Sequence, residues 1–130
     1  MRVLQPPGWP RPRGYANGIM AEGRLVFVAG QIGWDATQTI VSDDLVEQLS
    51  QTLENTLAVL REAGAGPEHV ARMTWYITDK REYLARAREF GEVYRMLMGK
   101  HYPAMAVVVV RALIEDRAKV EIETTAVVPA

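Results

Sequence analysis

The sequence predicts an α+β fold in which two helices cover one face of a β-sheet. Two segments repeat apolar residues at spacings of three and four, which is typical of amphipathic helices. Other segments alternate apolar with polar residues or run as β-branched stretches, which is typical of strands. The elements follow one another as β-β-(β)-α-β-α-β-β. Because two helices cannot cover both faces of a sheet this wide, we expect them on one face.

The composition fits one globular domain. The chain has 130 residues, of which 48% are hydrophobic and 24% are charged. The formal net charge of -1 creates no long-range field that would favour nucleic acid or an acidic membrane. Cysteine is absent, which excludes disulfides and thiolate metal sites and is compatible with the cytoplasm. No apolar run approaches the ~20 residues of a membrane helix. We therefore expect a cytoplasmic protein without nucleic-acid or membrane partners.

Residues 1–13 are expected to form a proline-rich arm, and residues 14–130 a single domain. Proline favours extended backbone and lacks an N–H donor, so we expect an irregular arm and regular order only from about Tyr15. Arg11 and Arg13 then belong to a solvated arm rather than to a phosphate clamp. The arm has no apolar core of the kind that a secretory signal needs.

Two strands are expected before the first helix. The segments that lead to Ala21 and from Leu25 to Ala29 are joined by a turn signal at Glu22 and Gly23, which favours a hairpin. Gly30 is expected to end the second strand. The following residues, 31 to 39, are expected to form a loop that holds at most one short strand.

The first helix is indicated by leucines at spacings of four and three. Ser42 is its expected N-cap, with acidic residues in the first turn where the helix dipole favours them. The helix is expected to run to Ala63 and to end at Gly64. The leucines that form its apolar stripe are Leu45, Leu49, Leu53, Leu57 and Leu60.

The second helix is expected to begin at Asp79, which with Glu82 resembles a capping box. Gly99 closes it, and Pro103 cannot continue it. Its apolar stripe consists of Tyr83, Leu84, Ala87, Phe90, Tyr94 and Leu97.

Three further strands are expected around the second helix. They cover Val70–Thr78, the β-branched run Val107–Val110 and Val120–Val128, the last two separated by a polar turn at residues 115–117. The run Val107–Val110 projects valines to both sides, which is typical of a strand buried on both faces. For a short chain, another copy of itself is the simplest cover for such a face.

Glu121 and Glu123 are the strongest candidates for chemistry. They lie two apart on one strand, so both point to the same face, away from the helices. One interpretation is a solvated strand face. The other is a face covered by a partner, where burial would raise the carboxyl pKa and suit general acid-base work.

Other residues have both a structural and a functional interpretation. Tyr15 is either packing or a ligand contact, and Gly30 with Gln31 either ends a strand or exposes backbone N–H groups to a ligand oxygen. His101 precedes Tyr102 and Pro103 at the start of what we expect to be a central strand. Trp34 and Trp75 either pack in the core or wall an aromatic ligand.

Metal and phosphate sites are not indicated. His69 and His101 are isolated and lack the spacing of metal ligands. The sequence has no glycine-rich phosphate loop, no Ser-His-Asp pattern and no zinc signature. We therefore expect no metal and no cofactor.

Taken in order, several segments resemble elements of the RidA (reactive intermediate deaminase, YjgF-type) family. Residues 14–18 resemble its G-P-Y-S-Q-A element, and residues 25–32 its L-V-F-T-S-G-Q-I strand. Residues 51–64 resemble its N-L-x-x-V-L-x-x-A-G helix. Residues 73–79 are similar to its T-x-x-x-T-D strand end, residues 103–104 to its P-A-R element, and residues 120–123 to its I-E-I-E element. The resemblance covers roughly residues 14 to 128.

The resemblance implies a chorismate mutase-like α+β fold with a mixed sheet, and a homotrimer with ligand clefts between subunits. It also implies hydrolysis of enamines or imines to a 2-oxo acid and ammonia, without a cofactor. By position, Tyr15 matches the family's cleft tyrosine and Glu121 the glutamate that positions or activates water. Gly30 matches the glycine whose backbone approaches the ligand.

Met105 departs from the family pattern. It stands where the P-A-R arginine binds a substrate carboxylate through two hydrogen bonds, which methionine cannot make. The chain therefore resembles an arginine-less branch of the family. Three functions stay open. The first is a deaminase acting on a larger or more apolar enamine or imine whose recognition does not need a carboxylate beside the reacting carbon. The others are a trimer that binds a small metabolite without turnover, and a trimeric scaffold.

Overall fold

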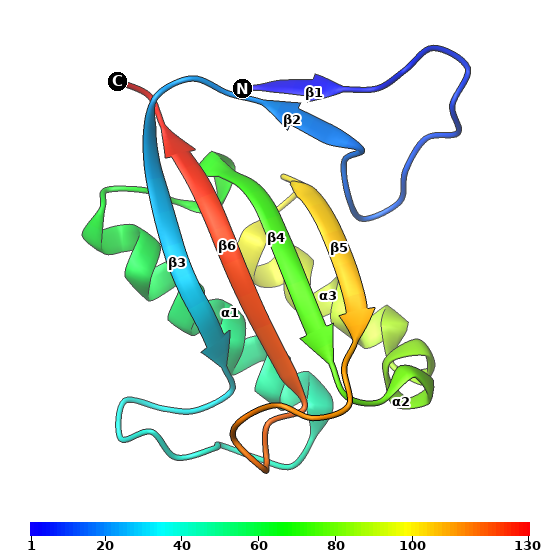
Figure 1. Cartoon of the computed structure of the whole chain (residues 1–130), viewed down its shortest axis with the longest axis vertical. Helices are drawn as coiled ribbons and strands as arrows, with labels where there is room; N and C mark the ends of the chain where they lie inside the picture. Colours follow the sequence, from blue (N-terminus) through cyan, green and yellow to red (C-terminus); the bar gives the residue numbers. More distant parts are fainter.

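A computed structural model describes residues 1–130 and contains a four-stranded sheet. The order across the sheet is β3 (Arg24–Ile32), β6 (Val120–Val128), β4 (Val70–Ile77) and β5 (Ala104–Val109). β6 is antiparallel to both of its neighbours, whereas β4 and β5 are parallel. The predicted mixed sheet is confirmed, and Figure 1 shows its strands side by side in this order.

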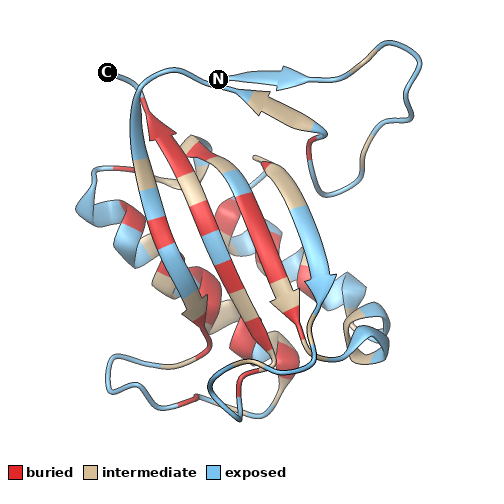
Figure 2. Cartoon of the chain, viewed as in Figure 1, coloured by how far each residue is buried: buried red, intermediate tan, exposed pale blue.

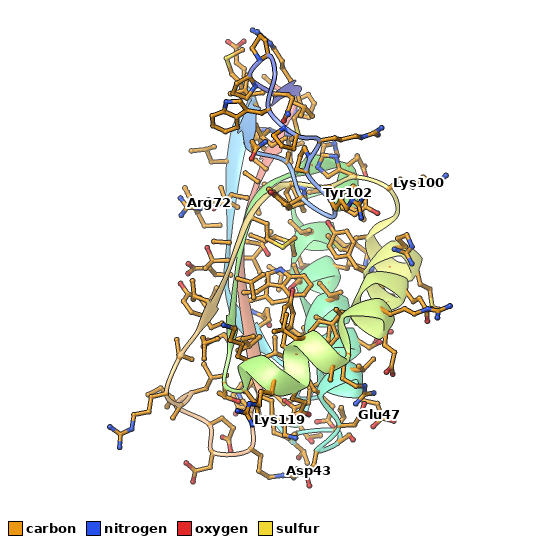
Figure 3. All side chains as sticks on the ribbon, turned by 90° about the vertical axis from the view of Figure 1, so that its right-hand side faces the viewer. Asp43, Glu47, Arg72, Lys100, Tyr102 and Lys119 are labelled. Atoms are coloured by element: carbon orange, nitrogen blue, oxygen red, sulfur yellow. The ribbon has the colours of Figure 1, made fainter.

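The helices lie on one face of the sheet, as predicted. α1 (Leu45–Glu62) packs against β3 and β6, and α3 (Ala87–Met98) packs against α1. Their apolar stripes meet the inner residues of the strands in one core, which includes Leu49, Phe90 and Ile122. Seen edge-on, the opposite face of the sheet is free of helices, and Arg72 extends from it (Figure 3).

β5 is an edge strand in this chain, so the expectation of a central strand buried on both sides is wrong for the single chain. Val107, Val108 and Val109 are 37%, 39% and 52% exposed. On the other edge, Phe27 of β3 is 72% exposed. Figure 2 shows that buried residues concentrate on β6 and β4. Apolar side chains are therefore left uncovered at both edges of the sheet.

The predicted hairpin of β2 (Gly18–Met20) with β3 is wrong. β2 pairs instead with β1 (Arg2–Leu4), and the two form a small antiparallel sheet above one end of the large one (Figure 1). After the turn between β2 and β3, the chain pairs with β6. Gly23 suits this turn, because its φ is +148° and the backbone of Val128 lies against it. The first dozen residues are consequently not all irregular.

Two predictions about the helices also change. The N-cap of α1 is Asp44, whose carboxylate accepts from Glu47 N, whereas Ser42 accepts from Asp44 N. The second helix is split at Arg86 into α2 (Lys80–Ala85) and α3. Arg86 leaves helical geometry and binds Asp44 with its guanidinium, 2.8 Å away. The predicted cap at Asp79 is confirmed, because its side chain accepts from Glu82 N.

The connections carry two smaller features. A single 3₁₀ turn, η1 (Pro67–His69), precedes β4. The short strand expected after β3 is reduced to an isolated bridge between Trp34 and Ile40. Gly30 does not end β3, because the strand continues to Ile32 after a bulge.

Candidate functional site

Glu121 lies on the helix-free face of the sheet. Its neighbours Val120 and Ile122 are fully buried on the helix side, so alternation turns Glu121 outward. It is half-buried, and its carboxylate has neither a hydrogen-bond donor nor a cation within bonding distance in this chain. The predicted orientation therefore agrees with the structure.

Gly30 lies directly beside this carboxylate. β3 has a bulge that sets Ala29 and Gly30 opposite the single residue Glu123 of β6, and such a bulge leaves backbone groups unpaired. A Cβ at position 30 would lie 2.9 Å from the carboxyl carbon of Glu121 and still closer to its Oε1. The absence of a side chain at Gly30 thus makes room for the Glu121 carboxylate. The amide of Gln31 is held by the backbone of its own strand, since it donates to Ala29 O over 3.0 Å.

Glu123 has a protein partner, unlike Glu121. Tyr76 on β4 donates its hydroxyl to Glu123 Oε1 over 2.7 Å. This hydrogen bond, with partial desolvation and the charges of the two glutamates, raises the pKa of Tyr76 above its ordinary value. The sequence interpretation did not single out Tyr76, although its alternation with Trp75 and Ile77 places it on the glutamate face.

Tyr15 and His101 lie in a separate groove of about 550 Å³ near the N-terminal segment. Ala16 N donates to Pro103 O and fixes Tyr15 beside the start of β5. Tyr15 is 41% exposed. His101 Nε2 lies 2.7 Å from Val70 O, so its ring is engaged by the backbone.

Met105 lines a second cavity, of about 250 Å³, on the helix side of the sheet. Its side chain also packs against the core. Met105 and Glu121 therefore face opposite sides of the sheet in one chain. Figure 3 shows Tyr102, another lining residue, beneath the N-terminal segment on the helix side.

The predicted site residues thus form separate groups. Tyr15 precedes Ala16, which bridges to Ala104 of β5, the residue opposite Arg72 of β4. Glu121 is instead opposite Tyr76, four residues further along β4. At ~3.3 Å per residue this offset is about 13 Å. Trp34 belongs to neither group, because it packs against the small cluster around Ile32, Ile40 and Ala118.

No three side chains of His, Cys, Asp or Glu are grouped so that they could hold a metal ion. None of the helices combines the length and apolar character that a membrane crossing requires.

Comparison with known proteins gives the family. The family model described as endoribonuclease L-PSP matches residues 10–128. A RutC family protein of Synechocystis is 36% identical over 99% of this chain and 98% of its own length. Human 2-iminobutanoate/2-iminopropanoate deaminase is 27% identical over 87% of this chain and 79% of its length. A solved structure of a Yersinia pestis Rid family protein of unknown function has a TM-score of 0.87, 30% identity and 98% coverage of both chains. The chain is therefore a member of the endoribonuclease L-PSP family, which includes the RidA, YjgF and RutC proteins.

Proposed function

We propose that this protein hydrolyses a reactive enamine or imine to a carbonyl compound and ammonia, as a homotrimer and without a cofactor. The family includes deaminases of this type, among them the human relative. The observation that carries the proposal is the free carboxylate of Glu121 beside the bulge at Gly30.

The chemistry requires the transfer of one proton in each of two steps. An enamine first becomes the imine by gaining a proton on carbon and losing one from nitrogen. Water then adds to the carbon of the C=N bond while a proton goes to nitrogen, which gives a tetrahedral amino alcohol. The C–N bond then breaks, ammonia leaves with a further proton, and the hydroxyl becomes a carbonyl. A carboxylate beside the carbon can accept the proton from water and return it to the leaving nitrogen, a role that we assign to Glu121.

The proposal requires a second copy of the chain. Tyr15 is our second candidate, but it lies about 13 Å along the sheet from the row of Glu121 in one chain. The uncovered edge strand β5 and the helix-free face offer apolar area for a partner subunit. A neighbouring subunit would then bring its Tyr15 towards Glu121. We propose three such clefts, by analogy with the family.

Met105 sets the expected substrate. Without a guanidinium at this position, a small 2-imino acid loses a charge-assisted contact, which we expect to cost about ten- to a hundred-fold in binding. We therefore propose a substrate larger or more apolar than 2-iminopropanoate, within an arginine-less branch of the family.

The test is hydrolysis of a panel of imines that an amino-acid oxidase generates in place. Ammonia release and the loss of trappable free imine are compared with spontaneous hydrolysis, for the native chain and for Glu121→Gln. Acceleration that is lost in Glu121→Gln supports the enzyme. No acceleration for any imine contradicts it.

The second candidate function is binding of a small metabolite without turnover. The observation that favours it is Met105 in place of the arginine, together with a formed cavity beside it. Binding of substrate-like 2-oxo acids without hydrolysis of the corresponding imines would select this function.

A further inference from the structure

The cavity beside Met105 has an aromatic wall. Trp75 lies 6.3 Å from Phe90 and 6.2 Å from Tyr94, measured between ring centroids. Tyr94 in turn stacks on Tyr102 at 5.6 Å, and all four rings line the cavity together with Met105. Rings and a thioether form a surface suited to an apolar or aromatic group.

Two cations line the same cavity. They are Arg13, from the N-terminal segment, and Arg95, from α3, and no carboxylate is among its 11 lining residues. Neither guanidinium forms an ion pair within the chain, whereas Arg86 and Arg117 do. Arg13 is therefore not merely part of a solvated arm. Unpaired guanidinium groups beside an apolar cavity favour an anionic ligand, above all a carboxylate.

The volume of the cavity limits the ligand. About 250 Å³ is available. At ~30 Å³ per water molecule, this is space for roughly eight waters. A small acid with a branched or aromatic side chain fits, with part of it at the open mouth. Pyruvate would leave most of the aromatic wall without a contact.

We propose that this cavity binds a branched-chain or aromatic 2-oxo or 2-imino acid, with Arg13 and Arg95 holding its carboxylate in place of the arginine absent at Met105. The side chain of the acid lies against the rings, and Met105 forms part of that apolar wall. This assignment rests on the proposed function in that the imino acid is the substrate and the oxo acid its product. Because the cavity and Glu121 lie on opposite sides of the sheet in one chain, the Glu121 that acts on the bound imino acid belongs to a neighbouring subunit.

The test is calorimetric titration of the full chain with stable ligands. These are 4-methyl-2-oxopentanoate, phenylpyruvate, pyruvate and phenylacetone, which lacks the carboxylate. We expect the first two to bind at least tenfold more tightly than the other two. The Arg13→Ala, Arg95→Ala double variant should weaken their binding by about ten- to a hundred-fold.

Two single variants serve as matched controls. Arg11→Ala changes the same segment but not this cavity, and Arg88→Ala changes an exposed residue of the same helix. Both should bind like the native chain. Circular dichroism and thermal melting check that every variant is folded. Equal binding of phenylacetone and phenylpyruvate, or unchanged binding in the double variant, would overturn the assignment.

Failure of this assignment and failure of the proposed function give different results. If the oxo acids bind as expected but no imine is hydrolysed faster than in buffer, the site stands and the deaminase proposal fails. If imines are hydrolysed but the Arg13→Ala, Arg95→Ala double variant binds the oxo acids as tightly as the native chain, the deaminase proposal stands and this assignment fails.

Discussion

The carboxylate of Glu121 occupies the space that a side chain at Gly30 would need. The two residues lie on adjacent strands, at the bulge that interrupts the pairing of β3 with β6. The bulge and the glycine together make room for this carboxylate. A side chain at position 30 would displace it, so a substitution of Gly30 tests whether the position of the Glu121 carboxylate matters for turnover.

We predict that Gly30→Ala lowers turnover at least tenfold, because the new methyl group displaces the Glu121 carboxylate. The measurement is the steady-state rate with any imine that the native chain hydrolyses. The change should add nothing to the loss caused by Glu121→Gln, since both act on one group. Independent, multiplying losses would contradict the link between the two residues.

Glu121→Gln should lower turnover by roughly a hundred-fold, since the amide keeps the shape but cannot accept and return a proton. Glu123→Gln is the matched control, because Glu123 is held by Tyr76 and points to the same face. It should retain most of the activity. The reverse order of effects would assign the chemistry to Glu123. Dissociation of Glu121→Gln into single chains, measured by light scattering, would indicate a role in assembly.

Met105→Arg should improve binding of pyruvate by about ten- to a hundred-fold, because it restores the charge-assisted contact with a small 2-oxo acid. It should weaken binding of phenylpyruvate, because the longer polar side chain takes up the apolar cavity. Calorimetric titration measures both ligands. The native chain should hydrolyse 2-iminopropanoate poorly. A native rate equal to that of an arginine-containing relative in the same assay would contradict the interpretation of Met105.

Assembly is tested at the edge strand. Light scattering at micromolar concentration should give the mass of a trimer. Val109→Asp should lower that mass, because this valine is 52% exposed in the single chain and a partner would bury the new charge unpaired. Lys100→Asp, an exposed position outside the strand, is the control. A monomeric native chain would rule out the trimer.

The stability of the fold should depend on the ionisation of Asp44. The hydrogen bond from Arg86, followed by that from Glu47 N, lowers the pKa of this carboxyl below its ordinary value. A lowered folded-state pKa stabilises the fold above the unfolded pKa, and this contribution disappears as pH falls through the folded pKa. Asp44→Asn should therefore cost about 0.5–1 kcal/mol near neutral pH, as an asparagine cap remains but the ion pair with Arg86 is lost.

Urea unfolding at a fixed protein concentration, near neutral pH and in acid, measures this difference between Asp44→Asn and the native chain. The difference should shrink in acid. Asp43→Asn is the control, since Asp43 forms only an exposed pair with Arg117. An equal effect of the two variants would argue against the cap and the contact with Arg86.

The parts of the fold that depend on local pattern could be predicted from the sequence. The leucine stripe defined α1 to within a few residues, and alternation around Ile122 gave the orientation of Glu121. Pairing between distant segments could not be predicted in the same way. A turn signal at Gly23 favoured a hairpin, but the partners of β2 and β3 lie at Arg2–Leu4 and in β6.

The candidate site was predicted in part for the same reason. Glu121 and Gly30 meet because β3 and β6 are neighbours, a relation that neither local segment contains. Arg95 continues the polar face of its helix in the sequence, and only the folded arrangement of α3 and the sheet makes it line the same cavity as Met105. Arg13 depends on the path of the chain after β1.

The pairing of β1 with β2 closes residues 5–17 into a loop, and this restricts the volume that Arg13 can sample. Inside the loop, Gln5 is tied to Trp9, Pro10 and Asn17 by side-chain hydrogen bonds. For a loop of this length the conformational entropy of closure corresponds to about 2 kcal/mol. Folding already includes this entropic cost, so ligand binding does not have to order the loop. The effective concentration of the Arg13 guanidinium at the cavity is therefore higher. The strand Arg2–Leu4, which does not line the cavity, thus sets how often a cation is available at its mouth.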